Sequence, residues 1–406
     1  MKFHNIVSSV VRKESFGGIV YIPSLNVQVA VNEDLYKLIR LCKTEKTFPK
    51  ILEKISRRYG TSFRKAKDIL EECSAIFRNE IENYEGSHDV ISDWGKVKQN
   101  PIRLSAPLML IIEITRTCNQ SCKFCYQLEE KADDEELSQD LIFSIVDQAK
   151  KMKVFKIQYM GGEPLCREDF GDILLYTSRK GIYSSFTTNG VYLNKFIHDL
   201  KKVKKLLPVQ ISIHGGSKEH LHLYKISARE WNKTLNNCEL LSSHGILFDV
   251  KTVISRLNCH KIVESIRMFS ELGARAVTLL HLLPVGGGKT MRNEANFTKG
   301  EVEDIVKQIN YAKGKFKNIH IDYRPFLNIY FPKEPRTELD KLINCPAGNL
   351  DLRIRYDGKV LQCSSLRMPL NDMRKNNLKS VWSSILSKML PCPYECNKVF
   401  HCVQNY

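Results

Sequence analysis

The feature that most constrains the fold is an alternation of short apolar runs and helical patterns between residues 108 and 288. Helical patterns such as Leu137–Lys151 and Lys261–Leu272 separate the runs. Repeated strand–helix units predict an α/β fold with a parallel sheet of six strands, because a parallel connection needs a crossover helix. Periodicity alone is compatible with both a partial barrel and an open sheet. The predicted strands are Met109–Thr115, Phe155–Met160, Tyr183–Thr187, Val209–Ile213, Leu247–Val253 and Ala276–Leu282.

Polar and glycine-rich segments follow the predicted strands or lie near their carboxyl ends. Because these ends share one edge of a parallel sheet, where αβ folds place active sites, we expect the segments to form a single site. Each motif alone is a weak signal, and their order along one sheet is what indicates a function. In chain order the segments are Cys118–Tyr126, Gly161–Pro164, Thr188–Gly190, Ser212–Gly216, Lys251–Thr252 and Leu283–Gly288.

Three cysteines in the first segment, Cys118, Cys122 and Cys125, have the spacing C-x3-C-x2-C. Thiolates ligate soft metals and iron–sulfur clusters. Three thiolates on a four-iron cubane leave one iron open, and an open coordination position indicates a reactive site. The alternative is a zinc knuckle with a remote fourth ligand, although zinc ligand pairs usually read C-x2-C.

The triplet with Tyr126 directly after it, followed by Gly161-Gly162-Glu163-Pro164 at the next strand, resembles the radical SAM superfamily over about Pro107–Gly288. The resemblance implies a partial (β/α)6 TIM-like barrel over residues 106–331. It also implies a [4Fe–4S] cluster on the three cysteines, whose fourth iron binds S-adenosylmethionine. Electron transfer into the sulfonium would give methionine and a 5′-deoxyadenosyl radical.

The resemblance further implies which residues contact S-adenosylmethionine. Gly161, Gly162 and Glu163 would hold its methionine amino group, since glycine lets the backbone approach closely. His214 stands where the family often has an acidic residue, and an ordinary loop histidine is the alternative reading. No general base can be named from a motif. The other implied contacts are Asn189 and Ser212 for ribose or carboxylate, Lys251 and Thr252 on the fifth strand, and Tyr126, Pro284 and Val285 for adenine.

Residues 332–406 are rich in cysteine and contain a hairpin signal, Asp357-Gly358, between two strand-like runs. Together with the cysteines around it, the hairpin resembles the SPASM or twitch extension, which holds auxiliary iron–sulfur clusters. Fewer cysteines are present than two clusters need, so we expect one auxiliary cluster. The alternative is a structural zinc. The expected ligands are Cys345, Cys363 and two of Cys392, Cys396 and Cys402.

Residues 1–88 read as a separate unit of three strands and three helices, followed by a polar linker over residues 89–105. This winged-helix-like order resembles the RiPP recognition element, which binds the leader of a ribosomally synthesised precursor peptide. A leader would add as an extra strand at a free sheet edge. The alternative is a module that binds DNA or only stabilises the enzyme, but a net charge of +3 over residues 1–90 is low for duplex contacts. The expected strands are Ile6–Lys13, Gly17–Pro23 and Asn26–Val31, and the expected helices are Glu33–Cys42, one from near Pro49, and Phe63–Tyr84.

Composition limits the partners and the compartment. The formal net charge of +17 over 406 residues favours an acidic partner, without choosing among nucleic acid, membrane surface and acidic peptide. No apolar run approaches the roughly 20 residues of a membrane span, and the N-terminus lacks the apolar core of a signal peptide, so we expect a cytoplasmic protein. Thirteen cysteines in that setting argue against a disulfide framework.

These expectations combine into a radical SAM maturase of a ribosomally synthesised peptide. The radical would abstract hydrogen from a core residue, and an auxiliary cluster would take up the leftover electron or hold a substrate thiolate. We expect an intramolecular cross-link, with a thioether preferred and carbon–carbon or carbon–oxygen linkage as alternatives. Flavodoxin or ferredoxin would donate the electron, and nucleic acid is not the expected partner. The rival functions are a peptide epimerase with Cys166 or Cys259 as hydrogen donor, an RNA-modifying radical SAM enzyme, a sulfatase-type maturase, and a non-catalytic iron–sulfur or zinc regulator that binds DNA.

Overall fold

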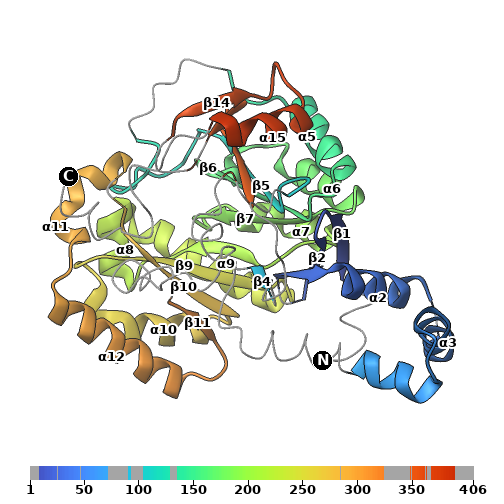
Figure 1. Ribbon diagram of the computed structural model, residues 1–406. Helices are drawn as coiled ribbons and strands as arrows, with labels where there is room; N and C mark the ends of the chain where they lie inside the picture. The colour runs from blue at the N-terminus through green and yellow to red at the C-terminus, as the bar shows by residue number, and fades with distance from the viewer. Residues whose placement is uncertain are drawn as a thin grey trace. The chain divides into compact units, whose positions relative to one another are not determined.

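The chain forms two compact units, which are described separately (Figure 1). The first comprises Met1–Ser105 and Pro335–Ile343, and the second comprises Ala106–Glu334 and Asn344–Tyr406. No helix in the described ranges is both long and apolar enough to cross a bilayer. The structure, a computed structural model, describes residues 9–24, 26–45, 47–71, 90–92, 104–128, 135–283, 285–323, 348, 350–361, 363 and 367–388.

The first unit joins a four-stranded sheet to helices. The strand order is β1-β2-β3-β4; β1 to β3 are antiparallel, whereas β4 runs parallel to β3. Residues 63–71 are also helical, and the rest of the third predicted helix lies outside the described residues. The elements are β1 Val10–Glu14, β2 Gly17–Ile22, β3 Val27–Asn32, α2 Glu33–Thr44, α3 Phe48–Tyr59 and β4 Val90–Ser92.

Local sequence explains where the first two helices begin. Asn32 caps α2 as predicted, because its side-chain oxygen accepts a hydrogen bond from the Leu35 amide at 2.9 Å. Pro49 lies in the first turn of α3, where its missing N–H costs nothing. Apolar residues of both helices, including Leu38 and Ile51, pack with the strands into one core.

Strand β4 was not expected, because the polar segment that contains it reads as a linker. Its three residues pair with Gln28, Val29 and Ala30 on the outer side of β3. One edge of β3 is therefore partly occupied by the chain itself.

The second unit is built on a ten-stranded sheet in the order β11-β10-β9-β8-β7-β6-β5-β12-β13-β14. Every neighbouring pair from β11 through β12 is parallel, and β12, β13 and β14 are antiparallel. The strands are β5 Met109–Thr115, β6 Lys156–Gly161, β7 Tyr183–Thr188, β8 Val209–Ser212, β9 Phe248–Ile254, β10 Ala276–His281, β11 His320–Asp322, β12 Asp351–Ile354, β13 Lys359–Leu361 and β14 Pro369–Asp372.

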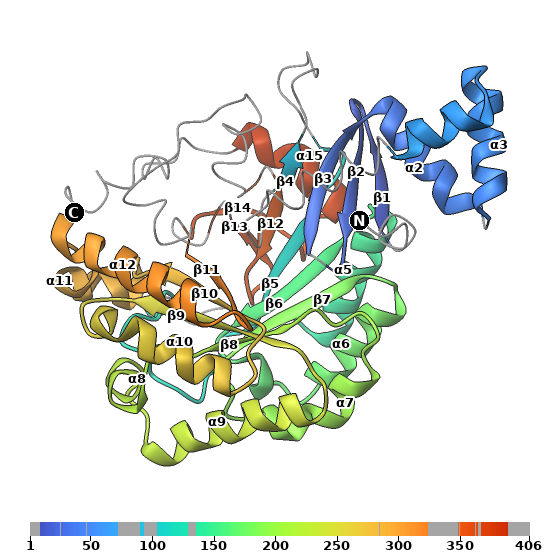
Figure 2. The same cartoon turned by 90° about the horizontal axis from the view of Figure 1, so that it is seen from below.

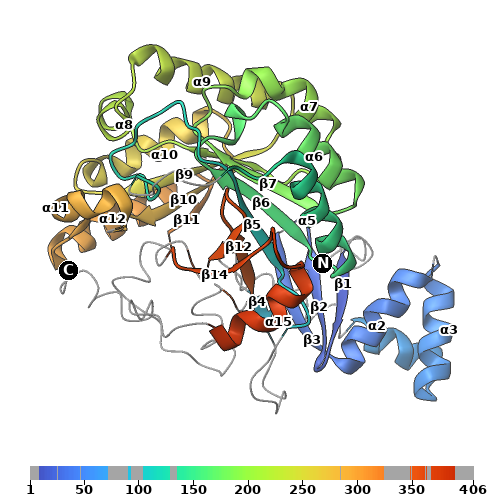
Figure 3. The same ribbon diagram turned by 90° about the horizontal axis from the view of Figure 1, so that it is seen from above.

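Helices cover the outer face of this curved sheet (Figures 2 and 3). Two of them, α9 and α12, begin with complete capping boxes at Ser227 and Thr298. Helix α15 packs beside α5 and β14. The helices are α5 Gln139–Lys151, α6 Phe170–Arg179, α7 Ile197–Lys202, α8 Ser217–Tyr224, α9 Ala228–Ser243, α10 Ile262–Glu271, α11 Arg292–Ala295, α12 Lys299–Lys315 and α15 Leu378–Lys388, with 3-10 turns η1 Pro164–Cys166, η2 Leu193–Phe196, η3 Cys259–Lys261 and η4 Gly286–Met291.

The two faces of the sheet differ in polarity. Gln158 on β6 donates hydrogen bonds to Thr187 on β7 at 3.2 Å and to Gln210 on β8 at 2.9 Å, so the inner face carries a polar network. Alternate residues on the helix side, such as Ile157 and Phe186, are fully buried. A polar inner face and an apolar outer face suit a partial barrel whose interior receives a ligand.

The six predicted strands correspond to β5 through β10, with ends that differ by at most one residue. The predicted hairpin is also present, as β12 and β13 around Asp357-Gly358. What the sequence did not indicate is that β12 pairs in parallel with β5, so the hairpin extends the main sheet.

Candidate functional site

The cysteine loop, defined here as residues 116–126, leaves the carboxyl end of β5 and is fastened to the end of β6. The Gly162 amide donates to the Thr115 carbonyl at 2.8 Å, and the Glu163 amide donates to the Thr117 carbonyl at 2.8 Å. The segment Gly161-Gly162-Glu163 therefore continues the sheet pairing directly into the loop that carries the cysteines. Two motifs that lie far apart in the sequence therefore form one backbone unit.

The three thiols of the cysteine loop lie close enough to influence one another. Desolvation is the largest cause that raises the pKa of Cys118 to about 12, although the residue as a whole is exposed, and Cys125 and Glu163 add to the shift. The pKa of Cys122 is raised by desolvation first and then by Cys118 and Cys125. Such a group of thiols ionises readily only next to a positive charge, which a bound metal supplies.

The two positions at the end of β6 that glycine occupies have no room for a larger residue. A Cβ built on Gly162 would stand 2.3 Å from the Thr117 carbonyl oxygen and 2.5 Å from that of Arg116. Gly161 has a φ of 133°, which side-chain-bearing residues rarely adopt. The close approach of the two backbones requires glycine at both positions.

Glu163 joins the ends of β6 and β7. Its buried carboxylate accepts hydrogen bonds from the Thr188 hydroxyl at 2.7 Å, the Asn189 amide at 2.7 Å and the Leu165 amide at 3.0 Å. Burial raises its pKa to about 7, in spite of these three donors. The carboxylate thus fixes the relative positions of the Gly161-Gly162 segment and Asn189.

Asn189 in turn contacts the cysteine loop. Its side-chain amide donates to the Asn119 side-chain oxygen at 2.8 Å, and the Cys166 thiol lies 3.9 Å from the same oxygen. The Thr234 hydroxyl of α9 holds the Asn189 carbonyl at 3.1 Å. Asn189 and the cysteine loop are therefore in direct contact.

The glycine-rich segment after β10 lies against the other side of the cysteine loop. The Gly287 amide donates to the Cys125 carbonyl at 2.8 Å, and a Cβ at Gly287 would stand 2.1 Å from the Lys123 carbonyl oxygen. Val285 is buried directly before this segment. Pro284, predicted beside it, lies outside the described residues.

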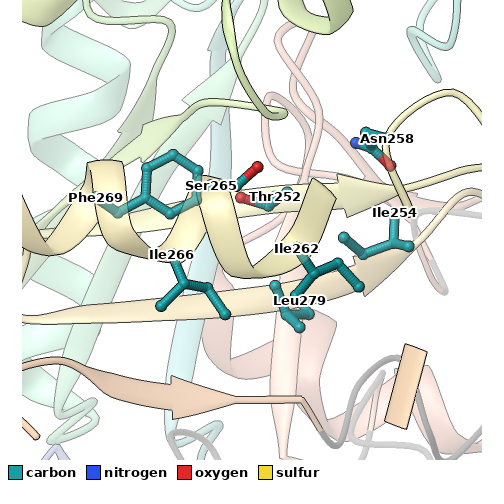
Figure 4. Close-up of a pocket in the computed structure, with 8 residues that line it drawn as sticks. All are labelled: Thr252, Ile254, Asn258, Ile262, Ser265, Ile266, Phe269 and Leu279. Carbon is teal, nitrogen blue, oxygen red and sulfur yellow. The ribbon is translucent and has the colours of Figure 1, made fainter. Parts of the chain in front are cut away.

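The predicted residues of the fourth and fifth strands are divided between the two faces of the sheet. Ser212 pairs with Lys251, and the Lys251 amine donates to Thr278 at 3.2 Å along the inner face. Thr252 is on the opposite face: it lines a small cavity with Ser265 and other residues of α10, and its hydroxyl donates to the Ile213 carbonyl at 2.7 Å (Figure 4). The structure therefore does not bring Thr252 to the site.

The contacts of His214 indicate a structural role. Its Nδ1 accepts a hydrogen bond from the Val253 amide at 3.0 Å, and its ring meets the Phe124 ring edge-to-face with centroids 5.0 Å apart. Burial lowers its pKa to about 3, which keeps the ring neutral. His214 thus supports the cysteine loop from the end of β8.

Comparison with known proteins adds the family to this geometry. The family model of the radical SAM superfamily matches residues 112–269, which span the cysteine loop, Gly161-Gly162-Glu163 and Asn189. The chain carries a radical SAM domain. The protein is an enzyme, and its radical SAM domain implies a [4Fe–4S] cluster and S-adenosylmethionine as cofactors.

Two sequence relatives and one solved structure of similar fold show how far the similarity reaches. "Probable GTP 3',8-cyclase" of Saccharolobus islandicus is 28% identical over 265 residues, covering 64% of this chain and 84% of the relative. "Mycofactocin maturase MftC" of Mycolicibacterium smegmatis is 28% identical over 219 residues, covering 54% of this chain and 55% of the relative. The crystal structure of Streptococcus suis SuiB bound to S-adenosylmethionine shares the fold with a TM-score of 0.67 at 19% identity, covering 92% of this chain and 86% of SuiB.

The residues around the cysteine loop fit the radical SAM cofactors. Asn119 has a buried Nδ2, and Gln120 has a buried amide nitrogen and oxygen, that find no hydrogen-bond partner in the described part of the chain. A buried polar atom without a partner requires an explanation, and a bound ligand or ion is one such explanation. Three thiols, orphaned amides and a bare glycine backbone form a donor set suited to an iron–sulfur cluster and a polar ligand.

Sequence reasoning missed the partners of Glu113, a fully buried carboxylate on β5. Arg367 binds it through two nitrogens, at 3.0 and 2.9 Å, and Arg353 approaches it at 3.3 Å. The Arg367 guanidinium also lies over the ring of Tyr126, 4.9 Å from its centroid. The available signal was a single acidic residue within the otherwise apolar run Met109–Thr115, since a charge there requires a partner.

Among the predicted auxiliary ligands, only Cys363 lies in the described part of the chain. It is half-buried, and its carbonyl accepts a hydrogen bond from the Arg367 amide at 3.2 Å. The others, Cys345, Cys392, Cys396 and Cys402, lie outside the described residues.

Proposed function

We propose that this radical SAM enzyme matures a ribosomally synthesised peptide. The observation that carries the proposal is that the fold similarity to SuiB covers 92% of the chain, well beyond the radical SAM domain itself. SuiB has also been crystallised with its precursor peptide SuiA, and MftC is named a maturase. A unit with its own core can hold a leader and raise the local concentration of the core peptide at the barrel.

In the proposal, Cys118, Cys122 and Cys125 hold the [4Fe–4S] cluster. When bound, this cluster supplies the electron that splits S-adenosylmethionine into methionine and a 5′-deoxyadenosyl radical. The protein holds the cysteine loop rigid through Gly162 and Gly287, which join it to the ends of β6 and β10. A fixed loop places the reactive carbon against one chosen C–H bond of the peptide.

The proposal extends to the residues that contact S-adenosylmethionine. Gly161, Gly162 and Glu163 offer backbone and carboxylate acceptors to the methionine amino group. The other proposed contacts are Asn189 and Ser212 for ribose or carboxylate, Lys251 on β9, and Tyr126, Pro284 and Val285 for adenine. Thr252 is left out because its side chain faces α10.

The leader docks on the first unit as an added strand on β3, in place of β4. Strand β3 has six residues, and β4 pairs with only three of them. A leader that pairs along all of β3 forms more main-chain hydrogen bonds than the strand that it displaces. The first unit thus acts as the RiPP recognition element that its order of strands and helices resembles.

The C-terminal cysteines hold one auxiliary iron–sulfur cluster in the proposal, through Cys345, Cys363 and two of Cys392, Cys396 and Cys402. The product is an intramolecular cross-link, preferably a thioether, with carbon–carbon or carbon–oxygen bonds as alternatives. Peptide epimerisation and RNA modification are the competing outcomes. Flavodoxin or ferredoxin delivers the reducing electrons.

The test combines the anaerobically reconstituted enzyme with dithionite, S-adenosylmethionine and a precursor peptide encoded beside its gene. We expect 5′-deoxyadenosine and a peptide that has lost two hydrogen atoms per event. Cys118→Ala is expected to abolish both products, whereas Cys259→Ala, which changes a cysteine outside the loop, keeps nucleoside formation. Unchanged mass with deuterium uptake would indicate epimerisation, and nucleoside release that depends on GTP or RNA in place of peptide would contradict the peptide assignment.

A further inference from the structure

The side chain of Asn119, directly after Cys118 in the cysteine loop, is satisfied at one end only. Its oxygen accepts a hydrogen bond from the Asn189 side-chain amide at 2.8 Å, and the Cys166 thiol lies 3.9 Å from the same oxygen. Its Nδ2 is buried and has no acceptor in the described part of the chain. A buried donor without an acceptor lowers stability, and a bound ligand that supplies the acceptor is one explanation for it.

The direction of the Asn119 amide follows from its neighbours. The oxygen and nitrogen of a side-chain amide can be exchanged by a flip, so their assignment depends on the hydrogen-bond network. The Val191 backbone amide donates to the Asn189 side-chain oxygen at 3.1 Å, which leaves the Asn189 nitrogen to face Asn119. Asn119 therefore presents its oxygen to Asn189 and its nitrogen to the opposite side. A backbone N–H, which cannot flip, thus fixes where the unpaired donor points.

The two ends of the cysteine loop are joined to different strand ends. Near the first end, the Glu163 amide after β6 donates to the Thr117 carbonyl at 2.8 Å. Near the last end, the Gly287 amide after β10 donates to the Cys125 carbonyl at 2.8 Å. Asn119 is two residues from Thr117, so it belongs to the end where the methionine amino group is proposed to bind, and not to the end proposed for adenine.

The chemistry of the methionine part of S-adenosylmethionine matches this donor. Its amino group and its carboxylate share one carbon atom, so an amino group held at Gly161, Gly162 and Glu163 brings the carboxylate to the same end of the loop. A carboxylate only accepts hydrogen bonds, and a bond to an ionised acceptor is roughly twice as strong as a neutral one. The Gln120 amide is also unpaired among the described residues, but no contact there fixes its direction.

We propose that Asn119 binds the carboxylate of S-adenosylmethionine through its Nδ2, and that Asn189 is a positioning residue that holds the Asn119 amide in the required direction. Asn189 can do so because the Val191 amide fixes its own orientation. The inference deepens the proposed function, since it rests on the amino-group site at Gly161, Gly162 and Glu163. It does not depend on the peptide substrate.

The test measures ligand binding to the anaerobically reconstituted, oxidised holoenzyme, without reductant and without peptide. The two probes are S-adenosylmethionine and decarboxylated S-adenosylmethionine, which lacks only the carboxylate. Equilibrium dialysis with labelled S-adenosylmethionine gives its dissociation constant, and competition against it gives that of the decarboxylated analogue. The ratio of the two constants is the preference for the carboxylate. Iron content is determined in the same samples.

Asn119→Asp keeps the oxygen that Asn189 contacts and exchanges only the Nδ2 for an oxygen. We expect it to bind S-adenosylmethionine about 10- to 100-fold more weakly, because a charge-assisted hydrogen bond is lost and two carboxylates face each other. Its affinity for the decarboxylated analogue should not fall, so the preference for the carboxylate decreases. Asn119→Ala, which removes the donor without adding a charge, is expected to reduce this preference by a smaller factor.

The matched control is Asn236→Asp, the same substitution at an exposed position of α9. We expect it to keep the iron content of the wild type and its affinity for both ligands. An unchanged preference for the carboxylate in the two Asn119 variants, at full iron content, would overturn the proposal. If Asn119→Ala then also lowers the midpoint potential of the cluster in the absence of ligand, the acceptor is a cluster sulfide.

Iron content separates a ligand contact from support of the loop. Loss of iron in both Asn119 variants, with full iron in Asn236→Asp, would show that the amide supports the loop itself, and the proposal would be wrong. A wild-type protein that holds iron but binds no S-adenosylmethionine would contradict the proposed function. Tight binding by the wild type with an unaltered preference in the variants would refute only the role of Asn119.

Discussion

Glu163 accepts a hydrogen bond from the backbone amide of Asn189 at 2.7 Å, which joins the loop after β6 to the loop after β7. Both loops also contact the cysteine loop, Glu163 through its backbone amide and Asn189 through its side chain. Glu163 thus joins three strand ends, those of β6 and β7 through its carboxylate and that of β5 through its backbone amide. The site is organised by the protein before any cofactor binds, which limits the conformational entropy lost on binding.

Replacing the Glu163 carboxylate by an amide of the same size is expected to lower both the stability of the fold and the affinity for S-adenosylmethionine. In Glu163→Gln, one acceptor oxygen is replaced by an NH2 group that meets N–H and O–H donors. We expect a loss of about 1–3 kcal/mol in the free energy of unfolding and a weaker affinity for S-adenosylmethionine. Thermal unfolding and equilibrium dialysis measure the two effects. Glu168→Gln, an exposed position in the same loop, serves as the control; equal stability of the two variants would refute the prediction.

A methyl group at Gly162 is expected to separate the cysteine loop from β6. The new Cβ would stand 2.3 Å from the Thr117 carbonyl oxygen, so one backbone must move. We expect Gly162→Ala to incorporate less iron on anaerobic reconstitution and to release little 5′-deoxyadenosine. Gly300→Ala in α12, where a Cβ meets nothing within 4 Å, should match the wild type in iron content. Full iron incorporation by Gly162→Ala would show that the loop tolerates the shift.

The buried His214 ring predicts a pH-dependent stability. Burial lowers the folded-state pKa to about 3, below the ordinary value of 6.5, so the unfolded chain binds the proton more readily. The stabilisation is complete above pH 6.5 and is lost as the pH falls towards 3, by up to about 1.4 kcal/mol per pH unit. Unfolding curves of the protein at several pH values give this slope. We expect a shallower slope in His214→Asn and an unchanged one in His198→Gln, a variant of an exposed histidine.

Strand β4 is expected to compete with a bound leader. Proline cannot donate to a β-ladder, so Ile91→Pro weakens the pairing of β4 with β3 at Val29. If the leader takes the same edge, its affinity should rise by about tenfold, equivalent to about 1.4 kcal/mol. Fluorescence anisotropy with a labelled leader peptide measures this change, and Gln99→Pro, further along the predicted linker, is the control. Unaltered or weaker binding in Ile91→Pro would place the leader elsewhere.

Several structural features could be predicted from the sequence because they depend on local chemistry. Asn32 caps α2, and Pro49 stands in the first turn of α3, because capping and proline geometry involve only a few neighbouring residues. The opposite orientations of Lys251 and Thr252 also follow from the two-residue period of a strand. The prediction that both face the ligand overlooked that period, and it fails for Thr252.

The sequence by itself determined the order of strands β5 to β10, the spacing of the three cysteines and the glycines that approach them, because each depends on short-range periodicity or on backbone conformation. Only the tertiary structure decided that β12 lies beside β5, that residues 90–92 cover β3, and that Arg353 and Arg367 meet Glu113 across 240 and 254 residues of chain. A buried carboxylate requires a cationic partner, but many of the 62 lysines and arginines are candidates for that partner. Which of them does so depends on the placement of β12 beside β5, and no local pattern encodes that pairing.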